Sequence, residues 1–87
     1  SINIRTEIMS TAYSGWRFKY KDGTYATNCW RIINDKWYYF NYNGYMESDC
    51  YVKSNAIEMY YWVESDGVWM PEWDTVTPDR GSYRVVS

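Results

Sequence analysis

The strongest constraint on this chain is a repeat with a period of 21 residues. A glycine, a cysteine and two aromatic positions of one copy recur in the next copy without a gap. The equivalent pairs are Trp16 and Trp37, Gly23 and Gly44, Cys29 and Cys50, and Trp30 and Tyr51. In a third copy Gly67 follows Gly44 after 23 positions. Such a period indicates a linear array of small units that bury their apolar faces on one another.

Each copy has the pattern of a β-hairpin. In the central copy we expect an aromatic strand over Lys36–Phe40, a tight turn over Asn41–Gly44 that ends in the Asn-Gly pair 43–44, and a return strand that begins at 45–47. An Asn-Gly pair supplies the positive φ angles that such a turn needs. Residues 30–33 would then form a connecting strand, with a second turn at 34–35.

The composition supports an all-β fold that is nearly free of helix. The chain has 87 residues, enough for one small domain, and 22% of them are aromatic, with 11 Tyr and 6 Trp. Leu is absent, and no segment has a sustained helical period. Tyr and Trp combine a large ring face with a polar tip, so they suit half-open pockets better than a sealed core.

The charge and the reactive side chains exclude several classes of protein. A net charge of −2 argues against a nucleic-acid partner, and no apolar run is long enough to span a membrane. The chain has no histidine, so it has no Ser-His-Asp arrangement, and two cysteines alone do not make a zinc site. We therefore expect neither catalysis nor a cofactor. Cys29 and Cys50 share one register of successive units, which usually separates Cα atoms by more than the roughly 6 Å of a disulfide, so reduced thiols are favoured.

The repeat divides the chain into three parts. Residues 1–14 are expected to form an N-terminal strand or a degenerate cap repeat, because Met9 lies at the spacing from Trp16 that the repeat requires. Residues 74–87 are expected to form a tail that ends in a short strand at 83–86. Three hairpin repeats lie between them and cover 15–73, at about 15–29, 30–50 and 51–73.

The central copy carries two motifs, Lys36-Trp37-Tyr38-Tyr39-Phe40 and Asn43-Gly44-Tyr45-Met46. They resemble the signature of the choline-binding, or cell-wall-binding, repeats that lie beside catalytic domains in bacterial and phage lysins. The resemblance extends over about 15–73, most of the chain.

This resemblance implies a solenoid of stacked β-hairpins, with cages of three or more aromatic rings between consecutive hairpins. It also implies a non-catalytic module that targets a peptidoglycan hydrolase, or endolysin, to choline-bearing teichoic acid. Such a protein acts at the bacterial cell wall, after secretion or after release from the host cytoplasm by phage lysis. The terminal hairpin would be a homodimer contact.

The sequence departs from the family pattern at several positions. Cys29 and Cys50 stand where the family usually has a glycine, and Tyr51 stands where it has a tryptophan. In the third copy either Met59 or Tyr60 takes the place of the first tryptophan. These changes affect how many complete cages the array can form.

Carried over by position, the resemblance places one cage at Trp30 and Trp37 with Tyr60 or Tyr61 of the next hairpin. A third cage would begin with Tyr51 and Tyr60. An earlier cage would combine Trp16 with Tyr38 or Tyr39, and with Met9 or a neighbour. The candidate ligand-binding residues are therefore Trp16, Trp30, Trp37, Tyr39, Tyr51, Tyr60 and Tyr61.

A quaternary ammonium has no N–H to donate, so electron-rich ring faces hold it rather than hydrogen bonds. Two other functions stay open: the rings could stack on a carbohydrate of a glucan or of peptidoglycan, or the array could be a structural dimerisation segment. Core packing is the competing role for each ring. Alternate residues of a strand face opposite ways, so either Tyr38 and Phe40 or Trp37 and Tyr39 belong to the core.

Overall fold

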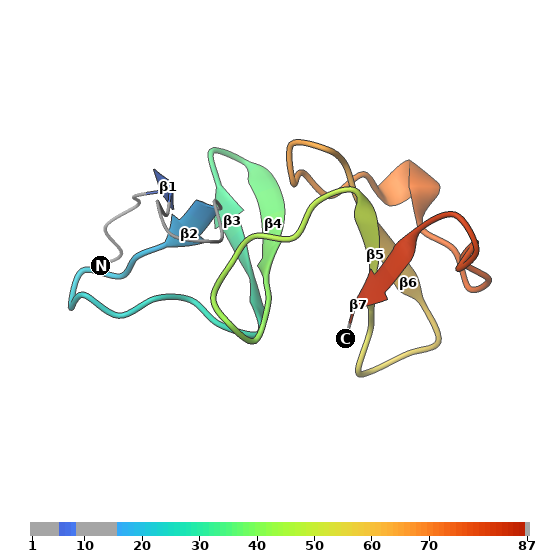
Figure 1. Cartoon of the computed structure of the whole chain (residues 1–87), viewed down its shortest axis with the longest axis horizontal. Coiled ribbons are helices and arrows are strands. Elements are labelled where there is room, and N and C mark those ends of the chain that lie inside the picture. Colours follow the sequence, from blue (N-terminus) through green and yellow to red (C-terminus); the bar gives the residue numbers. More distant parts are fainter. Residues whose placement is uncertain (1–5, 9–15, 87) are drawn as a thin grey trace.

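The computed structural model describes residues 6–8 and 16–86, and it is built almost entirely from short β-strands (Figure 1). This confirms the predicted all-β class. One turn of 3₁₀ helix, η1 (Pro71–Trp73), is the single helical element among the described residues. The strands are β1 (Thr6–Ile8), β2 (Trp16–Phe18), β3 (Cys29–Ile33), β4 (Lys36–Phe40), β5 (Cys50–Lys53), β6 (Tyr60–Val63) and β7 (Arg84–Val86).

The strands pair into small sheets that follow one another along the long axis of the molecule. Strands β1 and β2 pair antiparallel at one end, β3 and β4 in the middle, and β5 and β6 at the other end (Figure 1). Strand β7 returns from the C-terminal segment and pairs parallel with β5. The molecule is therefore an array of stacked hairpins, as the sequence predicted.

Equivalent backbone hydrogen bonds join each unit to the next. The amide of Met46 donates to the carbonyl of Trp16, and the amide of Trp69 donates to the carbonyl of Trp37, both at 2.9 Å. These two bonds occupy the same place in successive copies, because Met46 and Trp69 each follow a turn glycine by two positions. The repeat in the sequence thus corresponds to a repeated contact between units.

The strand pairing of the central copy differs from the prediction. Strand β4 pairs with β3 across the turn at Asn34 and Asp35, whose φ angles of 52° and 66° are those of a tight hairpin turn. Residues 45–47 contribute only the isolated bridge between Phe40 and Met46. The strand at 30–33 and the second turn at 34–35 are thus present as predicted, but the prediction that residues 45–47 begin the return strand of this hairpin was wrong. The chain uses 41–49 to cross from one unit to the next.

The predicted turn over 41–44 nevertheless forms, closed by a hydrogen bond of 2.9 Å from the amide of Gly44 to the carbonyl of Asn41, although of the Asn-Gly pair only Gly44 has a positive φ. Asn41 Oδ1 accepts hydrogen bonds from the amides of Asn43 and Tyr45, at 2.9 and 3.0 Å. Gly44 itself has a φ of 89°, a left-handed conformation that glycine adopts without strain. A Cβ there would lie 2.8 Å from Nη2 of Arg17, so the end of that flexible side chain would have to shift.

Most of the buried hydrophobic side chains in the described part of the chain fall into two clusters, and each cluster is shared between neighbouring units. The first cluster contains Phe18, Ala26, Ile33 and Phe40. The second contains Tyr39, Cys50, Val52 and Val63. Because every cluster draws on two units, no hairpin of the array buries its apolar side chains alone.

The two extra residues of the third copy lie in the turn between β5 and β6. This turn spans 54–59 and is held by Ser54 Oγ, which accepts hydrogen bonds from the amides of Ala56 and Ile57 at 3.1 and 3.2 Å. With the insertion placed there, Tyr60 and Trp37 are equivalent, since each precedes its turn glycine by seven positions. Tyr60, and not Met59, therefore takes the tryptophan position of the third copy.

The C-terminal segment is attached to the link between the second and third units. On β7, Arg84 Nη1 lies 3.0 Å from Glu47 Oε1, and Arg84 Nη2 donates to the carbonyl of Ser48 at 3.2 Å. Glu47 is buried, and Asn41 Nδ2 donates to its other carboxylate oxygen at 2.9 Å. The tail thus provides the cation that a buried carboxylate requires.

Both cysteines are free thiols, and they differ in surroundings. Cys29 is half-buried, whereas Cys50 is fully enclosed in the second core cluster. Burial raises the pKa of the Cys50 thiol to about 11, and the neighbouring charge of Glu47 adds to this. Within the described part of the chain, no helix is long and apolar enough to cross a membrane, and no three side chains are grouped to bind a metal ion.

Candidate functional site

Four aromatic side chains from two consecutive units surround an open hollow, which we call the junction hollow. It is lined by Trp30, Trp37, Tyr61 and Trp69 and has a volume of about 280 Å³. Trp30 lies on β3 and Trp37 on β4, so the second unit supplies two walls. Tyr61 lies on β6 and Trp69 just beyond its turn, so the third unit supplies the other two. The hollow exists only where two units meet.

Three of the four rings that line the junction hollow stand edge to face with one another. Trp30 lies 5.8 Å from Tyr61 and 6.4 Å from Trp69, measured between ring centroids, and Tyr61 lies 6.1 Å from Trp69. Two of these pairs are almost perpendicular, at 89°. Trp37 is 40% exposed and keeps the hollow open to solvent. Because the rings are perpendicular, their electron-rich faces border the open hollow from different directions.

Contacts on the far side of the hollow hold two of its walls, Trp69 and Trp30, in place. Trp69 Nε1 donates to the carboxylate of Asp74, at 3.0 and 3.1 Å from its two oxygens, and the amide of Trp62 donates to the same group at 3.0 Å. Trp30 packs on Tyr39, whose centroid lies 5.2 Å away. Burial raises the pKa of the Tyr39 phenol, and its hydroxyl donates to Asn28 Oδ1 at 2.8 Å. Both tryptophans are thus fixed before any ligand arrives.

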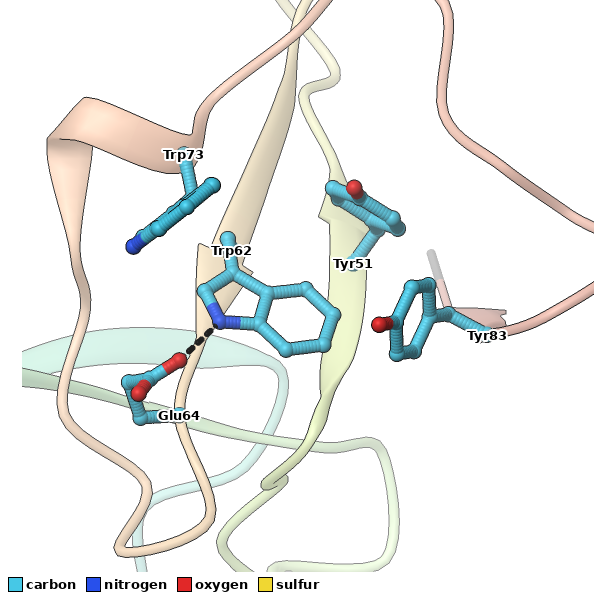
Figure 2. A pocket seen from close by; sticks show the side chains of 5 residues that line it. All are labelled: Tyr51, Trp62, Glu64, Trp73 and Tyr83. Atoms are coloured by element: carbon cyan, nitrogen blue, oxygen red, sulfur yellow. Dashed lines mark hydrogen bonds between the residues drawn. The ribbon is translucent and has the colours of Figure 1, made fainter.

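A second hollow, the terminal hollow, lies at the C-terminal end of the array (Figure 2). It has a volume of about 270 Å³. Four rings and one carboxylate line it: Tyr51, Trp62, Glu64, Trp73 and Tyr83. Figure 2 shows Trp62 in the centre, with the two tyrosines on one side and with Trp73 and Glu64 on the other.

The lining of the junction hollow determines the chemistry that it favours. Its described lining is wholly aromatic, so it offers ring faces and hardly any hydrogen-bonding groups. A cation without N–H groups loses little when it leaves water for such a site and is attracted by the quadrupole of each ring. The volume lies near the lower end of small-molecule sites, so the ligand group is small.

Comparison with known families decides the relationship of this chain. The profile of the choline-binding repeat matches residues 26–73, which is more than half of the sequence. The chain belongs to the choline-binding repeat family. This confirms the relationship that the motifs of the central copy indicated. The matched range contains every wall of the junction hollow.

Solved structures of choline-binding proteins resemble this one. The choline-binding domain of Spr1274 from Streptococcus pneumoniae superimposes with a TM-score of 0.62 at 26% identity, over 78% of this chain and 94% of that one. The Cpl-1 endolysin in complex with a peptidoglycan analogue gives 0.67 at 27% identity, over 80% of this chain. The pneumococcal cell-wall endolysin of phage Cp-1 in complex with choline gives 0.66 at 27%.

The extent of these matches differs between the relatives. This chain spans 19% of the length of either endolysin structure, so it corresponds to one part of such a protein. No protein with a curated function matches the sequence. The choline-binding repeat is a binding module, and the related endolysins are modular proteins.

The predicted site residues of this array of choline-binding repeats fall into three groups. Trp30, Trp37 and Tyr61 meet in the junction hollow, as one of the predicted combinations placed them. Tyr51 lines the terminal hollow, but without Tyr60. Tyr60 is only 5% exposed, because the tail covers it and Arg80 Nη2 donates to its hydroxyl at 2.7 Å.

The remaining predicted residues lie outside the two hollows. Tyr39 is 5% exposed and supports Trp30 from behind. Trp16 is exposed at the first junction, where Tyr38 and Met46 pack against the first core cluster. Met9, the other predicted wall there, lies outside the described residues. In the Trp37–Phe40 run, Phe40 belongs to the first cluster with Tyr38 packed against it, Tyr39 belongs to the second cluster, and Trp37 faces the junction hollow. Neither predicted division of this run into core and groove residues is therefore correct.

The sequence reasoning missed one wall of the junction hollow and most of the terminal hollow. Trp69 follows Gly67 by two positions, as Met46 follows Gly44 and Tyr25 follows Gly23, so a large side chain after each turn glycine was the available signal. Tyr83 has no comparable signal, and it reaches the terminal hollow because the tail folds back on β5. Trp73 lies outside that tail, on η1, and the contact of η1 with β6 brings it to the hollow.

Proposed function

We propose that this chain is a cell-wall-binding module that holds a choline-type quaternary ammonium in the junction hollow. The observation that carries the proposal is the convergence of four rings from two consecutive units on one open volume. Support comes from membership of the choline-binding repeat family and from the likeness to a phage endolysin in complex with choline.

The affinity of a single junction hollow is expected to be weak. Each ring face contributes about 0.5–2 kcal/mol to cation binding, depending on how completely the cation loses its water. After the cost of ordering the ligand, four faces correspond to a Kd of roughly 0.1–10 mM. A weak site suits a polymer that displays many copies of the same group, because several weak contacts then add up through avidity.

The biological setting is part of the same proposal. The module is a non-catalytic part of a peptidoglycan hydrolase or endolysin, and its target is choline-bearing teichoic acid at the bacterial cell wall. The chain reaches that wall by secretion or by phage lysis. The tail, which exposes Val76, would be a contact between two copies, and sedimentation velocity over a range of concentrations tests this arrangement.

Titration of the intrinsic tryptophan fluorescence with choline chloride tests the proposed ligand. We expect a saturable change in the wild-type chain and a loss of at least tenfold in affinity for Trp37→Ala. Tyr42→Ala is the matched control, since Tyr42 is 82% exposed and lines neither hollow. A wild-type chain that does not respond to about 100 mM choline, yet binds insoluble glucan, would contradict the proposal and favour a carbohydrate ligand.

A further inference from the structure

We propose that the terminal hollow is a second cation site with a different preference: it takes an alkylammonium that keeps at least one N–H, such as a protonated primary amine. This goes beyond the proposed function, because it concerns another set of residues and another class of ligand. The difference between the two hollows rests on one side chain, Glu64.

Paired strands and the returning tail build this hollow. Tyr51 on β5 and Trp62 on β6 are direct partners in the strand register, with ring centroids 4.9 Å apart. Tyr83, just before β7, lies 4.8 Å from Trp62 and 6.0 Å from Tyr51. Trp73, the last residue of η1, stands on the other side of Trp62 and is 61% exposed (Figure 2).

The terminal hollow and the junction hollow are built in a similar way. Tyr51 is the equivalent of Trp30 in the repeat. At the junction, two rings of the following segment, Tyr61 and Trp69, complete the enclosure. At the terminus, two rings that follow β6 in the chain, Trp73 and Tyr83, complete it. Three of the terminal rings are in mutual contact, so the site is formed without a ligand.

The carboxylate of Glu64 sets the ligand class. Trp62 Nε1 donates a hydrogen bond to Glu64 Oε1, which fixes the carboxylate beside the rings (Figure 2). An ionised carboxylate can accept about four hydrogen bonds, so it retains acceptor capacity for a ligand. A charged N–H donor that reaches it forms a charge-assisted bond, which is stronger than a neutral one.

The presence of Glu64 in one hollow and its absence from the other give quaternary and primary ammonium ions different preferred sites. A trimethylammonium has no N–H, so it gains an ionic attraction from Glu64 but no charge-assisted hydrogen bond. A primary ammonium is strongly hydrated and loses its water bonds in the wholly aromatic junction hollow without replacement. The same ion regains a bond at Glu64. The junction hollow therefore prefers the quaternary ion and the terminal hollow the primary one.

Choline and ethanolamine test this inference, because they differ only in the three methyl groups on nitrogen. Isothermal titration and the NMR signals of the indole N–H groups would be followed for the full chain and for Glu64→Gln, Trp73→Ala and Trp37→Ala. We expect ethanolamine to shift the Trp62 indole signal, and Glu64→Gln to weaken its binding roughly tenfold. Trp73→Ala should also weaken it, whereas Trp37→Ala should leave it unchanged.

Choline binding to the same variants is the internal control for folding and for the proposed function. Glu64→Gln should leave the affinity for choline at the junction hollow unchanged, which also shows that this variant is folded. The inference is overturned if ethanolamine does not perturb Trp62, if Glu64→Gln binds it as well as the wild type, or if choline displaces it from the terminal hollow. Loss of choline binding alone would count against the junction hollow and not against this second site.

Discussion

Replacing Trp69 with methionine gives the third unit the residue that the second unit already has at the same position. Met46 and Trp69 both follow a turn glycine by two positions, and both donate their amide to a tryptophan carbonyl at 2.9 Å. The substitution Trp69→Met therefore keeps the backbone contact between units and an apolar side chain of adequate length. It removes one aromatic wall of the junction hollow and nothing else of the enclosure.

The expected loss follows from the structure. One ring face contributes about 0.5–2 kcal/mol to binding of a cation, which corresponds to a Kd raised roughly 2- to 30-fold. Because Trp69 faces the same volume as Trp30 and Tyr61 and is held by Asp74, we expect about tenfold. The lost hydrogen bond to Asp74 lowers the unfolding free energy by about 1 kcal/mol, and Tm by roughly 4–8 °C for a domain of this size.

Isothermal titration with choline and thermal unfolding followed by circular dichroism measure the two effects separately. Tyr42→Ala removes an aromatic ring from the exposed surface and should change neither Kd nor Tm. The converse substitution Met46→Trp should create choline affinity at the first junction, beside Trp16. A lowered Tm together with an unchanged Kd in Trp69→Met would refute the reasoning, because the ring would then support the fold without forming a wall.

Three further predictions concern the core, the thiols and the tail. Phe40→Ala should lower the unfolding free energy, measured in urea, by about 3–5 kcal/mol, because Phe40 is fully enclosed in a cluster shared by two units. A loss below about 1 kcal/mol would show that the units fold separately. At pH 8, iodoacetamide should modify Cys29 well before Cys50, because the pKa of about 11 keeps the Cys50 thiol protonated. Peptide mass spectrometry follows the two reactions, and equal rates would contradict this prediction. Arg84→Ala should lower the unfolding free energy by about 1 kcal/mol, because it leaves the buried Glu47 without its cation. The exposure of Arg84 limits the effect. An unchanged urea midpoint would show that the tail does not secure the link between the second and third units.

The period of the repeat could be read from the sequence because it is an exact spacing of turn glycines and tryptophans. The spacing indicated stacked units, and the resemblance to choline-binding repeats, carried over by position, placed Trp30 and Trp37 with a tyrosine of the next unit. It could not choose between Tyr60 and Tyr61. That choice depends on where the two extra residues of the third copy lie, and the structure places them in the turn at 54–59, where the chain has room for a longer loop.

The pairing of the central hairpin was beyond sequence reasoning for a physical reason. The pairs at 34–35 and 43–44 are both able to form tight turns, so local propensity does not rank them. Contacts between units decide which of the two turns joins the paired strands. The amide of Met46 donates to the carbonyl of Trp16 in the preceding unit, so residues 45–47 are not free to pair with β4 along its whole length. Tertiary contact overrides the local pattern here.

The junction hollow and the second core cluster share their supports. Tyr39 belongs to the cluster with Cys50 and Val63 of the next unit, and the same ring packs on Trp30. Docking of the third unit therefore fixes Trp30 and brings Tyr61 to face it in one step. A ligand in the hollow touches both units, so it binds the stacked state and not the separated one, and its binding free energy adds to the stability of the stack. Because the contact that makes the array fold also makes the site, a single copy of the repeat can provide neither.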